Sequence, residues 1–188
     1  MKKSIVALLF CSIAASAVEI VNFDNAKDWY LNAHIVRRQT WKSVAETGKN
    51  GGNVAVITIS PSSSKANFME FYLSKPMVIA ANEAEFSKRS FVFDTCLSKA
   101  RDVWAFAIRC RDAKGEYFQF TAGHKLTDHK WETFVMPLAA TSWNSWGGNN
   151  DKKIDYPLTL LGFVPTYTKT LKEPLTVKIH GVCIEELE

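Results

Sequence analysis

Several features that define large classes of protein are missing from this sequence. Beyond its first residues, no apolar stretch is long enough to span a bilayer. Lys and Arg number 23 against 19 Asp and Glu, and no basic stripe occurs, so nucleic acid is not an expected partner. No G-x-S-x-G nucleophile motif, phosphate-binding loop or metal-ligand cluster is present. No long segment keeps a helical apolar period, and no repeat or linker divides the chain. These absences argue against a membrane-spanning protein, a nucleic-acid-binding protein and a chain of several domains.

Cysteine is also scarce, and its spacing fits no metal motif. Only Cys96, Cys110 and Cys183 follow the first twenty residues. Three cysteines allow one disulfide with one thiol left over, or three buried thiols. Export would favour a disulfide, and the sequence leaves both alternatives open.

The first residues have the order of a secretory signal. Lys2 and Lys3 precede an apolar run over residues 5–15, and the small-x-small pattern of a signal peptidase site ends at Ala17. We expect residues 1–17 to be a signal peptide, cleaved after Ala17, and the protein to be secreted or periplasmic without later membrane insertion. The alternative is a lipoprotein anchored on Cys11, but a bulky phenylalanine precedes that cysteine. Cleavage lowers the net charge from +4 to +2, because it removes two lysines.

Residues 18–188 are expected to fold as one all-β domain, a jelly-roll β-sandwich. Short runs alternate apolar with polar residues, as in half-buried strands, and turn residues separate them. Residues 25–29 and 81–86 are expected to form short helical turns, and Asp112 to Gly115 a tight hairpin. The predicted strands are Val18 to Asn22, Val54 to Ile59, Phe68 to Leu73, Phe91 to Leu97, Trp104 to Arg111, Tyr117 to Ala122, Glu132 to Pro137, Leu158 to Val164 and Leu175 to Glu185.

Alternation along these strands predicts which side chains face the core. In the strand from Trp104 to Arg111, one face carries Trp104, Phe106, Ile108 and Cys110, and we expect it to be core. The opposite face carries small residues and then two arginines. If the strands share a sheet, its outer face holds the side chains Glu70, Tyr72, Asp94, Arg109, Tyr117 and Gln119.

Three short motifs give the chain a family resemblance. Residues 21–24 run into Asp28-Trp29, residues 130–138 are similar to a W-x-x-F-x-I-P-L strand, and residues 175–185 are similar to an L-x-I-D-x-I-x-I-x last strand. Together they resemble the galactose-binding-like jelly-roll superfamily, which includes many carbohydrate-binding modules. The domain of complex I intermediate-associated proteins is a nearby relative. The resemblance implies a galactose-binding-domain-like fold over nearly all of residues 18–188, and this fold hosts many functions.

The resemblance also implies a possible structural calcium near the first and last strands. Asp24 and Glu185 could supply oxygens, but calcium needs six or more ligands. The last strand has Val182-Cys183 where such relatives carry an acidic pair. We therefore expect no obligatory cofactor, with calcium as the alternative.

Two regions are candidate ligand sites. The first is a long loop over residues 141–156, rich in Gly and Asn, in which Trp143 and Trp146 could stack on a sugar ring. The alternative is that one of them folds back on the core. Trp41, after a polar stretch, is a further stacking candidate, whereas Trp29, Trp104 and Trp131 are expected to be core.

The second candidate site is the predicted polar sheet face. On it Asp94, Arg109 and Gln119 could hydrogen-bond sugar hydroxyls, and Tyr72 or Tyr117 could stack on a ring. The alternative is a solvated face with weak cross-strand ion pairs. A ligand on this face would lie across the strands as an extended glycan chain.

The function that this pattern favours is a secreted, non-catalytic domain that binds a polysaccharide or other glycan. The alternatives are a cell-envelope protein-interaction domain and a jelly-roll polysaccharide lyase or glycoside hydrolase. A hydrolase would need two carboxylates at a set distance on one face. Glu70 and Asp94 are the pair that the predicted sheet could bring together, and Arg109, Tyr117 and Gln119 could serve a lyase. The sequence does not fix the oligomeric state.

Overall fold

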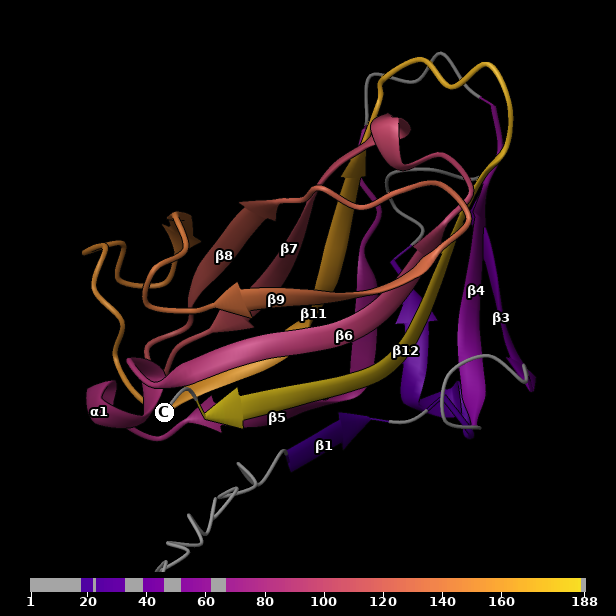
Figure 1. Ribbon diagram of the computed structural model, residues 1–188. Helices are drawn as coiled ribbons and strands as arrows, with labels where there is room; N and C mark the ends of the chain where they lie inside the picture. The colour runs from indigo at the N-terminus through magenta and orange to yellow at the C-terminus, as the bar shows by residue number, and fades with distance from the viewer. Residues whose placement is uncertain (1–17, 22, 33–38, 46–51, 62–66, 187–188) are drawn as a thin grey trace, which may run out of the picture.

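A computed structural model describes residues 18–21, 23–32, 39–45, 52–61 and 67–186. Two six-stranded antiparallel sheets pack face to face and enclose one core (Figure 1). In the first sheet, the strand order is β3-β4-β12-β6-β9, and β1 pairs with β12. Its strands are β1 (Val18–Val21), β3 (Gln39–Ala45), β4 (Asn53–Ile59), β6 (Arg89–Leu97), β9 (Trp131–Pro137) and β12 (Leu175–Glu186).

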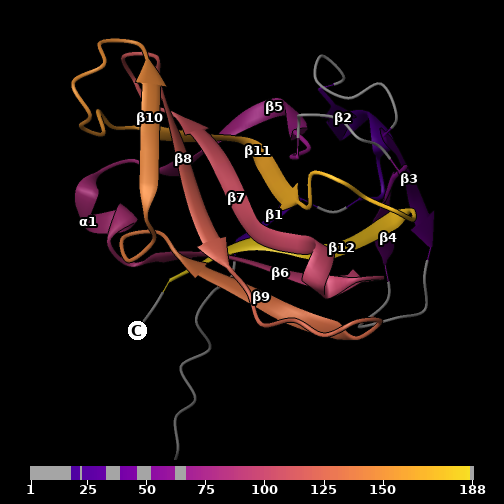
Figure 2. The ribbon, with the colours of Figure 1, turned by 90° about the horizontal axis from the view of Figure 1, so that it is seen from above.

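The second sheet has the order β10-β8-β7-β11-β5-β2, and Figure 2 shows it lying across the first. It carries the candidate site described below. Its strands are β2 (Trp29–Leu31), β5 (Phe71–Ala80), β7 (Val103–Arg111), β8 (Glu116–Gly123), β10 (Trp143–Gly147) and β11 (Leu158–Tyr167).

The predicted all-β jelly-roll sandwich is confirmed, and each predicted strand corresponds to an observed one. The predicted helical turns are also present, as η1 (Ala26–Asp28) and α1 (Glu83–Phe86), and a further turn is η2 (Ala100–Asp102). Three strands were not predicted: β2, β3 and β10. Each lies at the edge of a sheet, where a strand pairs on one side only and a clear apolar alternation is not required.

Phenylalanine dominates the interface between the sheets. Phe93 of β6 lies 5.1 Å, ring centroid to centroid, from Phe106 of β7 and 6.2 Å from Phe163 of β11. All three side chains are at most 2% exposed. Burying large aromatic rings from both sheets supplies the main driving force for closing the sandwich.

The prediction that Trp104 belongs to the core is wrong, because its side chain is 54% exposed. Phe106, Ile108 and Cys110 of the same strand are buried, as predicted. Opposite β11, Val103 pairs with Tyr167 and Ala105 with Thr166, so Trp104 is an extra residue at a register shift. A bulge of this kind redirects a side chain, and here it places Val103 in the core instead.

The described cysteines are thiols, and no disulfide joins Cys96, Cys110 and Cys183. Complete burial raises the pKa of the Cys110 thiol well above its ordinary value, so this side chain stays protonated. The predicted signal peptide, with Cys11, lies outside the described residues. In the part of the chain that is described, no helix has the length and apolar character needed to cross a bilayer.

Candidate functional site

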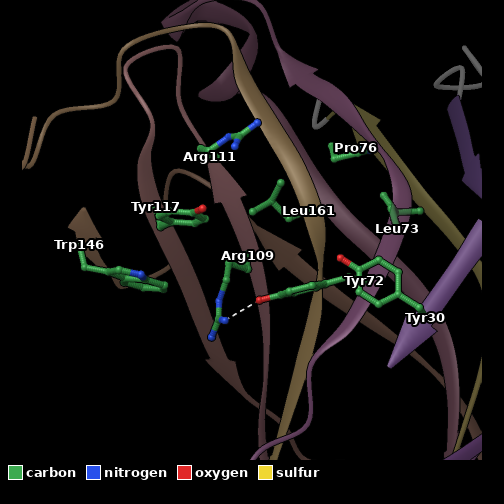
Figure 3. Close-up of a pocket in the computed structure, with 9 residues that line it drawn as sticks. All are labelled: Tyr30, Tyr72, Leu73, Pro76, Arg109, Arg111, Tyr117, Trp146 and Leu161. Carbon is green, nitrogen blue, oxygen red and sulfur yellow. Dashed lines mark hydrogen bonds between the residues drawn. The ribbon is translucent and has the colours of Figure 1, made fainter. Parts of the chain in front are cut away.

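A groove of about 270 Å³ crosses the outer face of the second sheet (Figure 3). All six strands of that sheet contribute to it, from Trp146 on β10 to Tyr30 on β2. With strands about 4.8 Å apart, these two edge strands are separated by about 24 Å. The lining side chains are Tyr30, Tyr72, Leu73, Pro76, Arg109, Arg111, Tyr117, Trp146 and Leu161.

Strand register arranges the groove side chains in two rows. One row runs through Tyr30, Tyr72, Gly162, Arg109 and Gln119, each paired with the next across neighbouring strands. In the second row, Tyr117 pairs with Arg111 on one side and with Trp146 on the other. Residues two apart on a strand face the same way, so both rows project from the outer face.

Arg109 lies in the middle of the groove and is held by three side chains. Its Nη1 donates hydrogen bonds to Glu70 Oε1 and Tyr72 Oη, and its Nη2 donates to Gln119 Oε1 at 2.8 Å. Glu70 is only 6% exposed, and its other oxygen accepts a hydrogen bond from Asn32. The guanidinium is therefore fixed in place, and its charge is compensated by a buried carboxylate.

Aromatic rings flank the guanidinium on both sides. Arg109 Cζ lies 5.1 Å from the centroid of the Trp146 ring and 5.8 Å from that of Tyr72, both within cation–π range. Tyr30 meets Tyr72 edge to face at 5.9 Å, and Tyr117 and Trp146 are nearly parallel at 5.7 Å. Arg109 thus divides the groove into a Tyr30–Tyr72 end and a Tyr117–Trp146 end, as Figure 3 shows.

The Tyr72 hydroxyl stays protonated at neutral pH. Desolvation by burial raises the pKa of Tyr72 to about 12, although the nearby Arg109 charge acts in the opposite direction. The neutral phenol can accept a hydrogen bond from Arg109 and donate one.

The close approach of Tyr72 and Arg109 depends on a glycine between their strands. Gly162 pairs with both residues, and a Cβ at this position would lie 2.3 Å from Phe71 O and 2.5 Å from Tyr72 Cδ1. The register shift beside it makes Leu161 an extra residue of β11, and its side chain lines the groove. The missing side chain leaves space for Tyr72 Oη and Arg109 to meet across β11.

Buried carboxylates near the β7–β8 hairpin hold the segment that follows Trp146. Asp112 accepts hydrogen bonds from the backbone N–H groups of Lys114, Glu116 and Asp155 at 2.8–3.2 Å, and Glu116 accepts one from Asp151 N at 3.1 Å. Gly148 packs so closely that a Cβ would lie 2.3 Å from Glu116 N. These contacts fix the chain after β10 against the hairpin and so help to position Trp146.

The segment from Thr141 to Tyr156, predicted as one long loop, begins with a strand. Residues 143–147 pair with β8, and Trp143 and Trp146 are three positions apart, so they point to opposite faces. Trp146 lies in the groove, whereas Trp143 contacts the buried Phe118 at 5.3 Å from the core side. Because β10 joins the second sheet, the tryptophan site and the polar-face site are one groove.

The prediction that Asp94 shares this face is wrong. Asp94 lies on β6 of the first sheet, where it accepts a hydrogen bond from Thr133. Glu70 immediately precedes β5 of the second sheet, so the two carboxylates belong to different sides of the sandwich and do not form a catalytic pair on one face. The sequence located the strands next to these two carboxylates but could not assign them to sheets, since strand pairing is non-local.

Of the other predicted ligand residues, Tyr72, Arg109 and Tyr117 line the groove, and Gln119 accepts a hydrogen bond from Arg109. Trp41 lies on β3 of the first sheet and packs edge to face on Phe71, 4.9 Å away, toward the core. Tyr30 and Arg111 were missed as site residues. The strand that carries Tyr30 has only three residues, too few to show an alternation of apolar and polar side chains. The alternation along β7 did place Arg111 on the outer face.

The predicted calcium ligands lie on separate elements. Asp24 is exposed in a bend after β1, and Glu185, near the end of β12, accepts a hydrogen bond from the Cys183 thiol. Among the described residues, no group of three or more His, Cys, Asp and Glu side chains is arranged to hold a metal ion. Calcium at these residues stays a prediction.

Comparison with known proteins identifies the fold. No protein-family model matches the chain, and no curated protein matches it in sequence. Its structure is similar to the family 11 carbohydrate-binding module of cellulase Lic26A-Cel5E from Clostridium thermocellum, with a TM-score of 0.57, 14% identity, and coverage of 93% of this chain and 98% of that one.

Two further structures give the same result. A family 11 module from Clostridium thermocellum in complex with a β-1,3-1,4-mixed-linked tetrasaccharide has a TM-score of 0.54 at 12% identity, covering 91% of this chain and 94% of that one. The family 30 module of cellulase Cel9D-Cel44B from the same organism has a TM-score of 0.54 at 13% identity, with coverage of 77% and 81%. The chain therefore has the galactose-binding-like jelly-roll fold of these carbohydrate-binding modules.

Proposed function

We propose that this chain is an exported, non-catalytic domain that binds a polysaccharide along the groove of the second sheet. The observation that carries the proposal is the set of four aromatic side chains from four strands, Tyr30, Tyr72, Tyr117 and Trp146, which line one open groove around a fixed arginine. Flat aromatic faces stack on the C–H groups of sugar rings, and the polar groups between them can bind hydroxyls.

The shape of the groove favours an extended chain over a single sugar. Aromatic side chains stand at both ends, on strands about 24 Å apart, and the groove is open along its length. A polymer crossing the strands would contact Tyr117 and Trp146, pass Arg109, and reach Tyr72 and Tyr30. A structurally similar family 11 module is known in complex with a mixed-linked tetrasaccharide, which supports oligosaccharide binding by this fold.

The chemistry of the groove favours binding over catalysis. Glu70 is buried against Arg109 and is not presented to a ligand. Tyr72 is poorly suited to be the base of a lyase, because burial raises its pKa and so disfavours loss of its proton.

Binding of the purified protein to a panel of soluble and insoluble polysaccharides, with reducing-sugar and unsaturated-product assays on the same samples, tests the proposal. We expect retention on at least one polysaccharide without product. Product would establish an enzyme, and the absence of retention would favour the envelope protein-interaction alternative.

Two tryptophan variants locate the site. Trp146→Ala should weaken binding by about 1–3 kcal/mol, or about 5- to 150-fold, because a stacking surface is lost. Trp104→Ala is the matched control, since Trp104 is also exposed on the second sheet but does not line the groove. Equal effects of the two variants in a binding titration would place the ligand elsewhere.

A further inference from the structure

The charge of the groove carries information about its ligand. Among the described residues that line it are two arginines, and none is Asp or Glu. The Tyr72 phenol adds no negative charge at neutral pH, because its pKa of about 12 lies far above 7. The nearby Glu70 carboxylate forms an ion pair with Arg109, so these two charges compensate each other.

The two arginines differ in their electrostatic roles. Arg109 is mostly buried, and Glu70, Tyr72 and Gln119 surround its guanidinium. Arg111 is exposed, and no carboxylate among the described residues forms an ion pair with it. Within the part of the chain that the structure describes, the groove therefore keeps one positive charge without an ion-pair partner, on Arg111.

Arg111 also lies where a bound chain would pass. Its strand partner on β8 is Tyr117, which pairs in turn with Trp146, so the cation belongs to the same row as the two stacked rings. Figure 3 shows the Arg111 side chain along one side of the groove, near Tyr117 and Leu161. A sugar stacked at this end would present the substituents at the edge of its ring toward Arg111.

We propose that the groove selects acidic polysaccharides, with an anionic sugar stacked at the Tyr117–Trp146 end and its carboxylate bound by Arg111. The planar guanidinium suits a carboxylate because it can donate two parallel hydrogen bonds. A sulfate ester offers similar oxygens, so the recognised chemistry is an anionic group on a pyranose ring. This inference rests on the proposed function and adds the class of ligand.

The test compares polymers that differ only in charge. Binding to polygalacturonate and to alginate is measured beside their carboxyl-reduced, neutral counterparts, with dextran sulfate as a third arm. We expect an acidic form to bind about tenfold more tightly than its neutral counterpart at low ionic strength, with the difference shrinking as salt is added. Tight binding to dextran sulfate alone would assign the anion as sulfate and overturn the carboxylate assignment.

Variants separate this inference from the proposed function. Arg111→Gln should abolish the preference for the acidic polymer, whereas Arg101→Gln, a control at an exposed arginine outside the groove, should keep it. Equal binding of acidic and neutral polymers, lost in Trp146→Ala, would overturn the acidic preference and leave the proposed function intact. Failure of every polysaccharide to bind would overturn both.

Discussion

The outer faces of the two sheets each carry a tryptophan, but the side chains next to these tryptophans differ. On the second sheet, Trp146 stacks on Tyr117 of the adjacent strand and lies beside the fixed Arg109. On the first sheet, Trp131 lines a hollow with Cys96 and Lys178, and Trp131 is the only Trp, Tyr or Phe among the described residues that line it. Core packing constrains the inner faces of both sheets, whereas the outer faces are free to differ. We therefore expect a binding site where aromatic side chains lie side by side across neighbouring strands, as they do in the groove.

The strongest test of this difference is the buried ion pair beneath the groove. Glu70→Ala leaves the mostly buried Arg109 charge without its carboxylate, and should lower the free energy of unfolding by about 3–5 kcal/mol. Glu173→Ala, which removes the exposed partner of Lys99, should have a far smaller effect, because solvent screens that pair. Urea denaturation measures the free energy of unfolding of both variants. Similar decreases would mean that the Glu70–Arg109 pair stabilises the fold no more than a surface ion pair does.

The glycine between Tyr72 and Arg109 gives the next largest effect. Gly162→Ala forces a methyl group against Phe71 O and should lower the free energy of unfolding by about 1–3 kcal/mol. It should also weaken glycan binding, because β5 and β7 must move apart. Gly123→Ala on β8, whose Cβ would have no neighbour closer than 3.8 Å, should be neutral or stabilising in the same assays. If Gly162→Ala changed neither the free energy of unfolding nor glycan binding, the close approach of Tyr72 and Arg109 would not depend on this glycine.

The two tryptophans of β10 should separate stability from binding. Trp143→Ala loses the contact with Phe118 and should lower the free energy of unfolding by about 1–2 kcal/mol, since the side chain is only partly buried. The folded variant should bind glycan as the wild type does. Thermal melts and binding titrations on Trp143→Ala and Trp146→Ala measure the two effects. Loss of binding in the folded Trp143→Ala variant would contradict the assignment of Trp143 to the inner face.

The last expected effect is absent at neutral pH and appears only as a dependence of stability on alkaline pH. The pKa of Tyr72 is about 12 in the folded protein against an ordinary 10.0, so the folded state holds this proton more tightly. The resulting stabilisation is complete below pH 10 and is lost as the pH rises toward 12. Tyr72→Phe should lose less stability than the wild type between pH 10 and 12, measured by urea denaturation at each pH. Identical slopes would mean that Tyr72 titrates normally. Tyr156 and Tyr167, whose pKa values burial also raises, contribute equally to both proteins.

Much of the site could be predicted one strand at a time. Alternation placed Tyr72, Arg109, Tyr117 and Gln119 on outward faces, and the structure brings these four together. The same reasoning failed for Trp104, because a bulge adds a residue to β7 and interrupts the alternation. It also missed Tyr30, since β2 is too short to show a period.

The sequence alone determined all the strands except β2, β3 and β10 and, within most of those it determined, the direction of each side chain, because the two-residue period is a local property of an extended backbone. Only the tertiary structure decided which strands are neighbours, and so it separated Asp94 from the groove and added Trp146 to it. Pairing depends on hydrogen bonds and core contacts between residues far apart in the chain, which no local pattern records. The groove is a property of the rows that run across the strands, and these rows exist only after the sheet has formed.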